Sequence, residues 1–151
     1  MADEIPITPD QATDLNEACI ADKFRLLNRV ITNLYDEALS PIGITTSQMN
    51  ILVVVAKYGE ATPNKVCSWL HMEKSTLSRN VRLLRNSGWI EAIPGQGRSH
   101  KLRLTSKGTE ILNKGLPLWK GAQARASSML GERGVDEVVR IAGRIRSEDI
   151  A

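Results

Sequence analysis

Apolar residues along most of this chain recur every three or four positions, the spacing of an amphipathic helix. The first run starts at Thr8-Pro9-Asp10, where Thr can cap a helix, Pro suits its first turn and Asp favours its positive end. Pro41 and Gly43 stop the run, which predicts one helix over residues 8–40. A helix of about 30 residues is longer than a small domain needs, so we expect part of its apolar stripe to meet another subunit.

Three shorter helices are predicted in the middle of the chain from caps and prolines at their starts and glycines or turns at their ends. The last of them has an apolar stripe at Leu77, Val81 and Leu84, spaced i, i+4 and i+7. The expected helices are one capped by Thr46 or Ser47 and closed by Gly59, one over 64–70 opened by Thr62-Pro63, and, after a turn at His71-Met72, one over 74–87 ended by Gly88.

The spacing then changes to that of strands. Residues 89–93 and 101–105 are predicted as strands, and the second of them alternates polar and apolar residues with period two. Between them lies Pro94-Gly95-Gln96-Gly97, whose glycines permit the positive φ of a hairpin tip. The sequence therefore predicts a β-hairpin after the third short helix.

The C-terminal part of the chain returns to helical spacing. Thr105 or Ser106 can cap this helix, Pro117 is expected to bend or split it, and a final helix is expected after Gly131 and Gly134. The predicted fold class is mainly α with a small β-hairpin. Helices from both termini form a frame around a central helix-turn-helix and its hairpin.

Positive charge is concentrated in the central segment. Residues 57–107 hold ten Lys and Arg but three acids, a local charge of +7 in a chain whose total is +3. The other residues therefore sum to −4, and their apolar stripes suit them to joining two copies of the segment. A basic helix-turn-helix with a hairpin indicates a surface for the phosphate backbone of nucleic acid.

The composition disfavours several other classes of protein. The longest apolar run, residues 51–56, is far too short to span a bilayer, and the acidic start Met1-Ala2-Asp3-Glu4 lacks the pattern of a signal peptide. We therefore expect a cytoplasmic protein with no membrane partner. Cys19 and Cys67 lack C-x-x-C spacing, and two histidines are too few to suggest a metal site. With no catalytic signature visible, we expect neither an enzyme nor a cofactor.

The helix over 74–87 carries candidate chemistry opposite its apolar stripe. Arginine can bind guanine through two hydrogen bonds, and short hydroxyl side chains approach phosphates or bases without bulk, so this face suits a major groove. The helix N-terminus adds backbone N–H groups as phosphate donors. An ordinary solvated helix face is the alternative. The candidate DNA-binding residues on this helix are Lys74, Ser75, Thr76, Ser78, Arg79 and Arg82.

Several motifs occur together in and around this segment. They are residues 70–81, Leu84 with Gly88-Trp89-Ile90, Arg98, and Leu104-Thr105-Ser106-Lys107-Gly108. This combination closely resembles the MarR family of bacterial winged-helix transcription regulators. The order of helices matches over nearly the whole chain, including Tyr35-Asp36 and residues 39–45 before the second helix.

The resemblance implies a single domain over residues 1–151, with a winged helix-turn-helix lobe over 46–108 and dimerisation helices over 8–40 and 109–148. It also implies a homodimer that binds a palindromic operator in double-stranded DNA and usually represses transcription. A small-molecule effector or an oxidant is expected to change its affinity for DNA. By the same resemblance, residues 74–82 form the recognition surface and Arg98 at the wing tip enters the minor groove.

Three residues depart from the family pattern. Gln96 stands two positions before Arg98, where an acidic residue is frequent and can orient the guanidinium. Glu73 stands at the cap of the recognition helix, where Ser or Asp is common and caps better. His71 occupies a turn position where glycine is frequent, although histidine tolerates the left-handed conformation better than β-branched residues do.

Other side chains have subsidiary candidate roles. Lys101 and Arg103 are expected to touch phosphates without reading sequence. His100 is expected to be a solvated loop residue, the alternative being a source of charge at low pH. Cys19 is either a small apolar residue in the dimer seam or a redox sensor. Core packing is expected for the tryptophans, with an effector pocket wall as the alternative: Trp69, Trp89 and Trp119.

The leading hypothesis is a dimeric, sequence-specific DNA-binding regulator. The alternative is a winged-helix module used for protein partnership or for non-specific nucleoid binding. Competition against bulk genomic DNA separates the two, because a specificity ratio near one favours the alternative.

Overall fold

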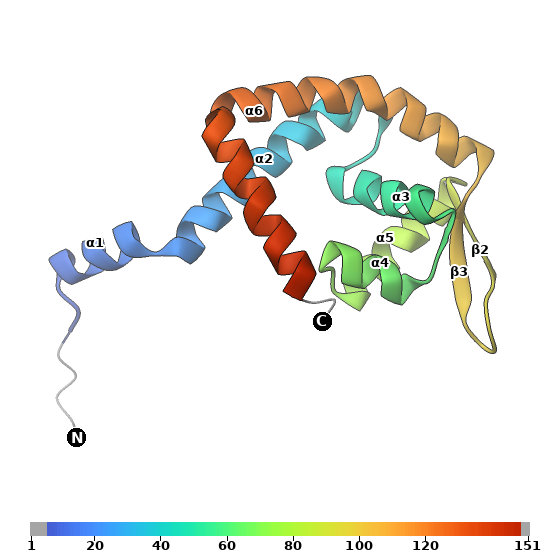
Figure 1. Cartoon of the computed structure of the whole chain (residues 1–151), viewed down its shortest axis with the longest axis horizontal. Coiled ribbons are helices and arrows are strands. Elements are labelled where there is room, and N and C mark those ends of the chain that lie inside the picture. Colours follow the sequence, from blue (N-terminus) through green and yellow to red (C-terminus); the bar gives the residue numbers. More distant parts are fainter. Residues whose placement is uncertain (1–5, 149–151) are drawn as a thin grey trace. The chain divides into compact units, whose positions relative to one another are not determined.

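The computed structural model of the chain describes residues 6–148, and its internal contacts divide the chain into two units, residues 1–33 and 34–151. The first unit holds α1 (Pro9–Ala18) and most of α2 (Ile20–Leu39). The second holds the end of α2 and every later element (Figure 1). The acidic start Met1-Ala2-Asp3-Glu4, on which the expectation about a signal peptide rests, lies outside the described residues.

The predicted single helix over residues 8–40 is wrong, because the chain leaves the helical conformation at Cys19. The helix begins as expected at Thr8, whose hydroxyl accepts from the Gln11 backbone N–H at 3.3 Å. At Cys19 the ψ angle is 106°, and the sulfur accepts from the Asp22 backbone N–H at 3.4 Å as α2 begins. No residue of α1 is buried. Packing supplies most of a helix's stability in proteins, so nothing within α1 keeps it in line with α2.

α2 ends where proline and glycine predict, in the short 3₁₀ helix η1 (Ser40–Ile42). α3 (Thr46–Tyr58) is then capped by Thr45, one residue before the predicted pair, because Thr45 and Gln48 form a reciprocal capping box. Thr46 has another partner: its backbone N–H and its hydroxyl both donate to the Asp36 carboxylate at 2.6 Å. Asp36 therefore ties the end of α2 to the start of α3.

The predicted helix-turn-helix is confirmed as α4 (Pro63–Leu70) and α5 (Lys74–Asn86). Thr62 caps α4, since its hydroxyl accepts from the Lys65 backbone N–H at 3.2 Å. α5 ends at Asn86 with Ser87 as its C-cap residue, and Gly88 follows with a φ of 74°. These boundaries follow the cap, proline and glycine signals of the sequence.

The sheet is one strand larger than the predicted hairpin. β2 (Ile90–Pro94) and β3 (His100–Leu104) pair antiparallel, with Ile90 opposite Leu104 and Pro94 opposite His100. Along the other edge of β3 lies β1 (Glu60–Ala61), which gives the order β1-β3-β2. A strand of two residues is too short to show the period-two pattern that reveals strands in a sequence.

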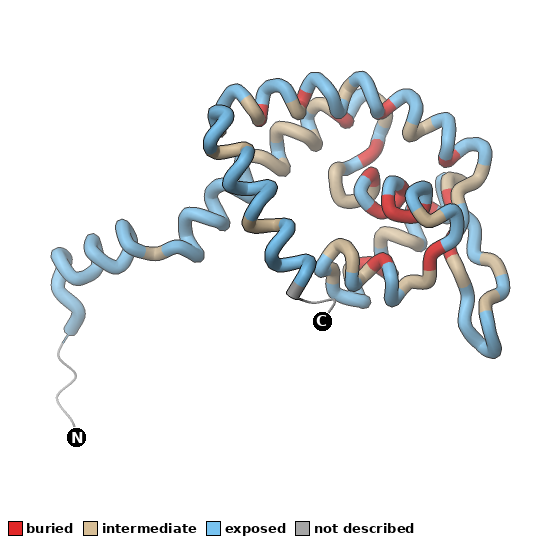
Figure 2. The backbone as a smooth tube through the Cα atoms, in the orientation of Figure 1, coloured by how far each residue is buried: buried red, intermediate tan, exposed pale blue. Residues whose placement is uncertain are grey.

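α3, α4, α5 and the three strands pack into one lobe of the second unit, which we call the winged lobe. Its interior is apolar, and the buried positions gather on these elements (Figure 2). α5 contributes Leu77 and Leu84 and β3 contributes Leu102, in agreement with the helical and strand periodicity of the sequence. The largest fully buried side chains are Leu39, Ile51, Leu52, Leu77, Leu84, Leu102, Val55 and Val66.

α6 (Ser106–Glu148) breaks at Gly131 and not at Pro117, where a bend or split was expected. Pro117 leaves the Asn113 carbonyl without its helical donor, but both residues are exposed, so water can bind that carbonyl. At Gly131 φ is 70° and ψ is 163°, outside the helical region. Beyond it the helix turns toward α4 (Figure 1), where the Arg146 guanidinium lies 5.1 Å from the centre of the Trp69 ring.

The motif at the start of α6 forms a close junction with the sheet. The Thr105 hydroxyl accepts from the Gly108 N–H at 3.0 Å and donates to the Gly88 carbonyl at 2.5 Å. A Cβ atom at Gly108 would lie 2.0 Å from the carbonyl oxygen of Trp89. Only glycine fits this position, because real Cβ atoms do not approach backbone atoms so closely.

The end of α2 is attached to α6 by polar contacts. The Tyr35 hydroxyl forms a hydrogen bond with the side-chain oxygen of Gln123, and burial raises the pKa of Tyr35. Arg125 lies 3.8 Å from the Glu37 carboxylate. Gly115 packs close to Ile42 and Met49, so α6 also covers the start of α3.

Many apolar side chains of the terminal helices remain exposed. In the first unit Phe24 is 55% exposed, and in α6 Val139 is 65% exposed. The core position expected for Trp119 is wrong, because this side chain is exposed on α6. The exposed set includes Ile20, Leu26, Leu27 and Val30 of α2 and Leu116, Met129, Val138 and Ile145 of α6.

Over residues 6–148 no single helix is long and apolar enough to cross a membrane. One bent pair of helices reaches the required length and composition only when the two are taken together.

Candidate nucleic-acid interface

The turn between α4 and α5 sets the direction of the recognition helix. His71 adopts the left-handed conformation, with φ 49° and ψ 42°, which confirms that histidine can take the place of a turn glycine here. The next residue, Met72, donates its N–H to the Cys67 carbonyl at 3.0 Å and so satisfies the end of α4. Three residues, 71–73, thus separate α4 from α5.

α5 starts without a side-chain cap. Glu73 is the N-cap residue and makes no capping hydrogen bond, as its longer side chain predicts. The first backbone N–H groups of α5 therefore have no acceptor from the cap side chain. Unsatisfied donors at the positive end of a helix are suited to an anion such as a phosphate.

The two predicted faces of α5 are present. Leu77 and Leu84 are buried and Val81 is half-buried, so the apolar stripe points into the winged lobe. On the other side Thr76 is half-buried and accepts from the Arg79 guanidinium at 3.3 Å. The remaining candidate residues of this helix are all exposed: Lys74, Ser75, Ser78, Arg79 and Arg82.

The wing tip is a closed turn. Gly95 donates its N–H to the Ser99 carbonyl at 3.0 Å, and Ser99 donates its own N–H to the Gln96 carbonyl at 3.1 Å. Gly97 supplies the positive φ of 62° that the turn requires. Arg98 follows at the tip, exposed, and across residues 6–148 it has no ion-pair partner. With Gln96 in place of an acid, nothing described orients its guanidinium.

Lys101 and Arg103 lie on the outer face of the sheet and are already paired with carboxylates. The Lys101 ammonium lies 3.1 Å from Glu60, and Arg103 donates to Glu91 at 3.0 and 2.9 Å. The register explains the contacts, because both Glu60 and Glu91 stand opposite Arg103 on the neighbouring strands. All four side chains are well exposed, so these ion pairs are weak and exchangeable.

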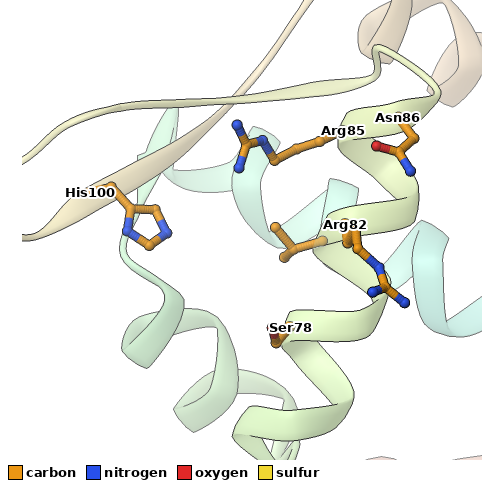
Figure 3. A pocket seen from close by; sticks show the side chains of 6 residues that line it. Ser78, Arg82, Arg85, Asn86 and His100 are labelled. Carbon is orange, nitrogen blue, oxygen red and sulfur yellow. The ribbon is translucent and has the colours of Figure 1, made fainter.

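A groove between α5 and β3 is present that the sequence did not predict. It has a volume of about 610 Å³ and is lined by Ser78, Val81, Arg82, Arg85, Asn86 and His100 (Figure 3). Arg85 extends across it toward His100. The spacing of Arg85, three residues after Arg82 and seven after Ser78, was the signal in the sequence that placed it on the same helix face.

The other candidate residues are not part of the exposed face of α5 or of the wing tip. Cys19 is half-exposed at the break between α1 and α2, and the nearby Lys23 ammonium binds the Asn16 carbonyl at 3.0 Å and Asp22 at 3.6 Å. Trp69 and Trp89 pack against the core of the winged lobe, as expected. Among the described residues no group of three or more His, Cys, Asp or Glu side chains could hold a metal ion.

Three helices, α3, α4 and α5, pack around an apolar core beside a small sheet, and α5, the second helix of the helix-turn-helix, has an exposed cationic face. This arrangement defines a winged helix-turn-helix protein. The sequence profile of the MarR family matches residues 42–99, which covers the recognition helix and the wing tip. Over these residues the chain is similar to the MarR family.

Individual proteins show the same relationship. YwoH, an uncharacterized HTH-type transcriptional regulator of Bacillus subtilis, is 29% identical over 82 residues, which cover 54% of this chain and 60% of YwoH. The matched part of the chain thus spans less than two thirds of this curated relative. The M. tuberculosis regulator MosR, solved in complex with DNA, is 28% identical over 85% of this chain and 97% of its own, with a TM-score of 0.74.

A more distantly related structure has a similar fold. A mutant of E. coli MarR, solved in complex with operator DNA, is 22% identical and covers 87% of this chain and 96% of its own, with a TM-score of 0.78. At that identity the likeness shows the fold alone. It extends beyond the winged lobe, because a match of this length includes parts of the terminal helices.

Proposed function

We propose that this protein is a sequence-specific DNA-binding transcription regulator, which acts as a repressor. The observation that carries the proposal is the exposed face of α5, where cationic and hydroxyl side chains stand opposite an apolar stripe whose two leucines, Leu77 and Leu84, are buried. A helix held in this way presents a rigid surface to a major groove. The DNA complexes of MosR and of MarR support the same use of this fold.

The proposed assembly is a homodimer on a palindromic operator. Support comes from the exposed apolar side chains of α2 and α6, such as Phe24 and Val139, which are costly to leave in water. Two copies related by a twofold axis would place their recognition helices in successive major grooves, about 34 Å apart. The DNA and the dimer partner then use different parts of the chain.

A small molecule or an oxidant is the proposed signal that changes DNA affinity. Similarity to the MarR family is its support, and Cys19, accessible at the helix break, is the candidate for oxidation. The relatives described above are transcription regulators, which supports a role without catalysis. Binding to chromosomal DNA gives the cytoplasm as the proposed site of action.

The decisive experiment compares binding to the promoter region of the protein's own gene with binding to random DNA of the same length at physiological salt. We expect a clear preference for the promoter fragment. Arg79→Ala should relax this preference, because Arg79 lies on the base-reading face, whereas Lys101→Ala should weaken binding to all sequences alike. The Lys101 effect should be small, because Glu60 already competes for its ammonium.

The outcome that overturns the proposal is equal affinity for both fragments. Equal loss of preference in Arg79→Ala and Lys101→Ala would contradict the assigned division between base reading and backbone contact. Arg133→Ala on α6, which removes an exposed cation outside the winged lobe, is the control for a simple change of net charge.

A second candidate function is non-specific nucleoid binding or protein partnership through the winged lobe. Two observations favour it: Glu73 leaves α5 uncapped, and Gln96 leaves Arg98 without an orienting carboxylate. Competition with bulk genomic DNA distinguishes the candidates. A specificity ratio near one supports the second, and a ratio of about a thousand or more supports the first.

A further inference from the structure

The groove between α5 and β3 has a lining of one charge sign. Its side chains are two guanidiniums, an imidazole, an amide, a hydroxyl and one apolar group, and no carboxylate lines it. The two acids on the strands of the sheet, Glu60 and Glu91, bind Lys101 and Arg103. A groove with hydrogen-bond donors on both walls and no negatively charged side chain in its lining attracts an anion.

Side chains along β3 alternate between the two faces of the sheet. This alternation explains why the ion pairs of Lys101 and Arg103 are separate from the groove that His100 lines. Successive side chains of a strand point to opposite faces, so His100 shares a face with the buried Leu102, which packs toward the helices. Lys101 and Arg103 point to the opposite face and meet their carboxylates there. His100 thus overhangs α5, while its neighbour in sequence does not.

The helix contributes a matching stripe. Ser78, Arg82 and Arg85 stand at i, i+4 and i+7 and therefore lie along one side of α5. Figure 3 shows the Arg85 side chain directed across the groove toward His100. Ser78 lies nearer the N-terminal end of the same helix. Arg85 and His100 come from opposite walls, so an anion between them would contact the helix and the wing together.

The shape of the groove favours an extended polyanion over a small molecule. Every lining residue except the half-buried Val81 is exposed. Sites for small molecules bury most of their ligand's surface, whereas a phosphate in a nucleic-acid backbone stays open to water on one side. The groove also adjoins the exposed face of α5 through the shared residues Ser78 and Arg82.

We propose that this groove is a phosphate clamp, in which Arg85 of α5 and His100 of the wing together hold one backbone phosphate of bound DNA. This inference rests on the proposed function. The guanidinium supplies a paired, charged donor, the imidazole supplies an N–H donor, and Ser78 and Asn86 add neutral donors beside them. Such a contact fixes the depth and register of α5 in the major groove of DNA, and it does so without reading a base.

The test measures how DNA affinity depends on salt, using both the promoter fragment and a mixed-sequence duplex. Loss of one phosphate contact reduces the slope of log K against log salt by about one. For Arg85→Gln we expect a reduction of about two with both DNAs, because the substitution occurs once in each copy of the proposed dimer. We also expect about a tenfold weaker affinity and an unchanged specificity ratio. Arg133→Gln on α6, an equal loss of charge, should leave slope and affinity as in the wild type.

Two further variants separate a clamp from a general charge effect. Arg85→Lys keeps the charge but not the paired donors, so it should retain the slope and recover only part of the affinity. His100→Ala should weaken binding by itself but add little in the presence of Arg85→Gln, because both residues hold the same phosphate. Additive effects of the two substitutions would overturn the clamp, as would a wild-type slope in Arg85→Gln.

The outcomes also separate this inference from the proposed function. No preference for the promoter fragment overturns the proposed function, while a reduced slope of Arg85→Gln on mixed-sequence DNA still supports the clamp. Absence of all DNA binding overturns both. Inorganic phosphate, added at constant ionic strength, is the final arm, and we expect it to displace DNA from the wild type more than from Arg85→Gln, because it competes for the same groove. Phosphate binding that is lost in Arg85→Gln but leaves the DNA affinity of the wild type unchanged would assign the groove to a free anion and overturn the DNA assignment.

Discussion

The winged lobe and the terminal helices both carry periodic apolar patterns, but the lobe buries most of its own, whereas many apolar side chains of the terminal helices are exposed. Leu84 on α5 and Leu102 on β3 are 0% exposed, whereas Phe24 on α2 is 55% and Val139 on α6 is 65% exposed. A periodic apolar stripe predicts that a face will be covered, without saying by what. In the lobe the cover is the same chain. For the terminal helices we propose that it is a second copy.

The two regions differ in charge as well. The winged lobe, over residues 46–104, carries nine of the 20 Lys and Arg of the chain. Those of α5 and the wing tip have no carboxylate partner among the described residues. α6 instead contains local pairs of opposite sign, such as Arg140 with Glu137, where the arginine lowers the pKa of the glutamate. Unpaired charge therefore marks the surface proposed for DNA, and unburied apolar area marks the surface proposed for dimerisation.

The largest effect is expected from emptying the core of the winged lobe. Leu84→Ala should lower the free energy of unfolding by about 2–5 kcal/mol, because it leaves a cavity where a fully buried leucine packed. Its neighbour Leu83 is 50% exposed, and Leu83→Ala should change stability by less than about 0.5 kcal/mol. Urea unfolding followed by circular dichroism measures both. Similar losses in the two variants would show that the lobe does not bury its own stripe.

The next effect sharpens the contrast in what covers each stripe. Phe24→Glu or Val139→Glu should shift the protein from dimer to monomer, by about 3 kcal/mol or more, since each substitution occurs twice in a symmetric interface. Leu83→Glu is the matched control, because it places the same charge at a similarly exposed apolar position in the lobe. Sedimentation velocity reports the mass. A monomer with Leu83→Glu and a dimer with Phe24→Glu would reverse the assignment of the two regions.

The fold of the lobe could be predicted where the signals are local. Thr62-Pro63 starts α4 and Gly88 follows α5, because caps, proline and glycine act on their own few residues. The break at Cys19 could not be predicted, since no proline or glycine lies there and the thiol substitutes for a cap. β1 was equally hidden, and with it the pairing of Glu60 with Lys101.

The site divides in the same way. The exposed face of α5 follows from helical spacing, so its DNA-binding candidates could be named from the sequence. The groove could not be predicted. Arg85 and His100 line it together only because of the register of β2 on β3 and the packing of α5 against the sheet. The availability of each cation likewise depends on strand pairing, which puts Glu91 opposite Arg103 but leaves Arg98 alone at the tip.

A smaller loss is expected at the junction between the lobe and α6. Gly108→Ala should destabilise the protein by about 1–3 kcal/mol, because the new methyl group meets the Trp89 carbonyl and the strand must shift. Gly143→Ala, in the exposed part of α6 with open space around it, should instead stabilise by about 0.5–1 kcal/mol. Thermal unfolding separates the two signs. Stabilisation by Gly108→Ala would show that α6 does not approach the sheet so closely.

The smallest effect concerns the uncapped start of α5, in contrast to the capped starts of α3 and α4. Glu73→Asp keeps the charge but shortens the side chain to one that caps well, so it should raise the free energy of unfolding by about 0.5–1 kcal/mol. Thr62→Ala, which removes the cap of α4, should cost a similar amount. If the open N-terminus of α5 is kept for a phosphate, Glu73→Asp should also weaken DNA binding, because the new carboxylate occupies the same N–H groups. A more stable variant with unchanged DNA affinity would place the phosphates elsewhere on the lobe, with the Arg85 groove as the remaining contact.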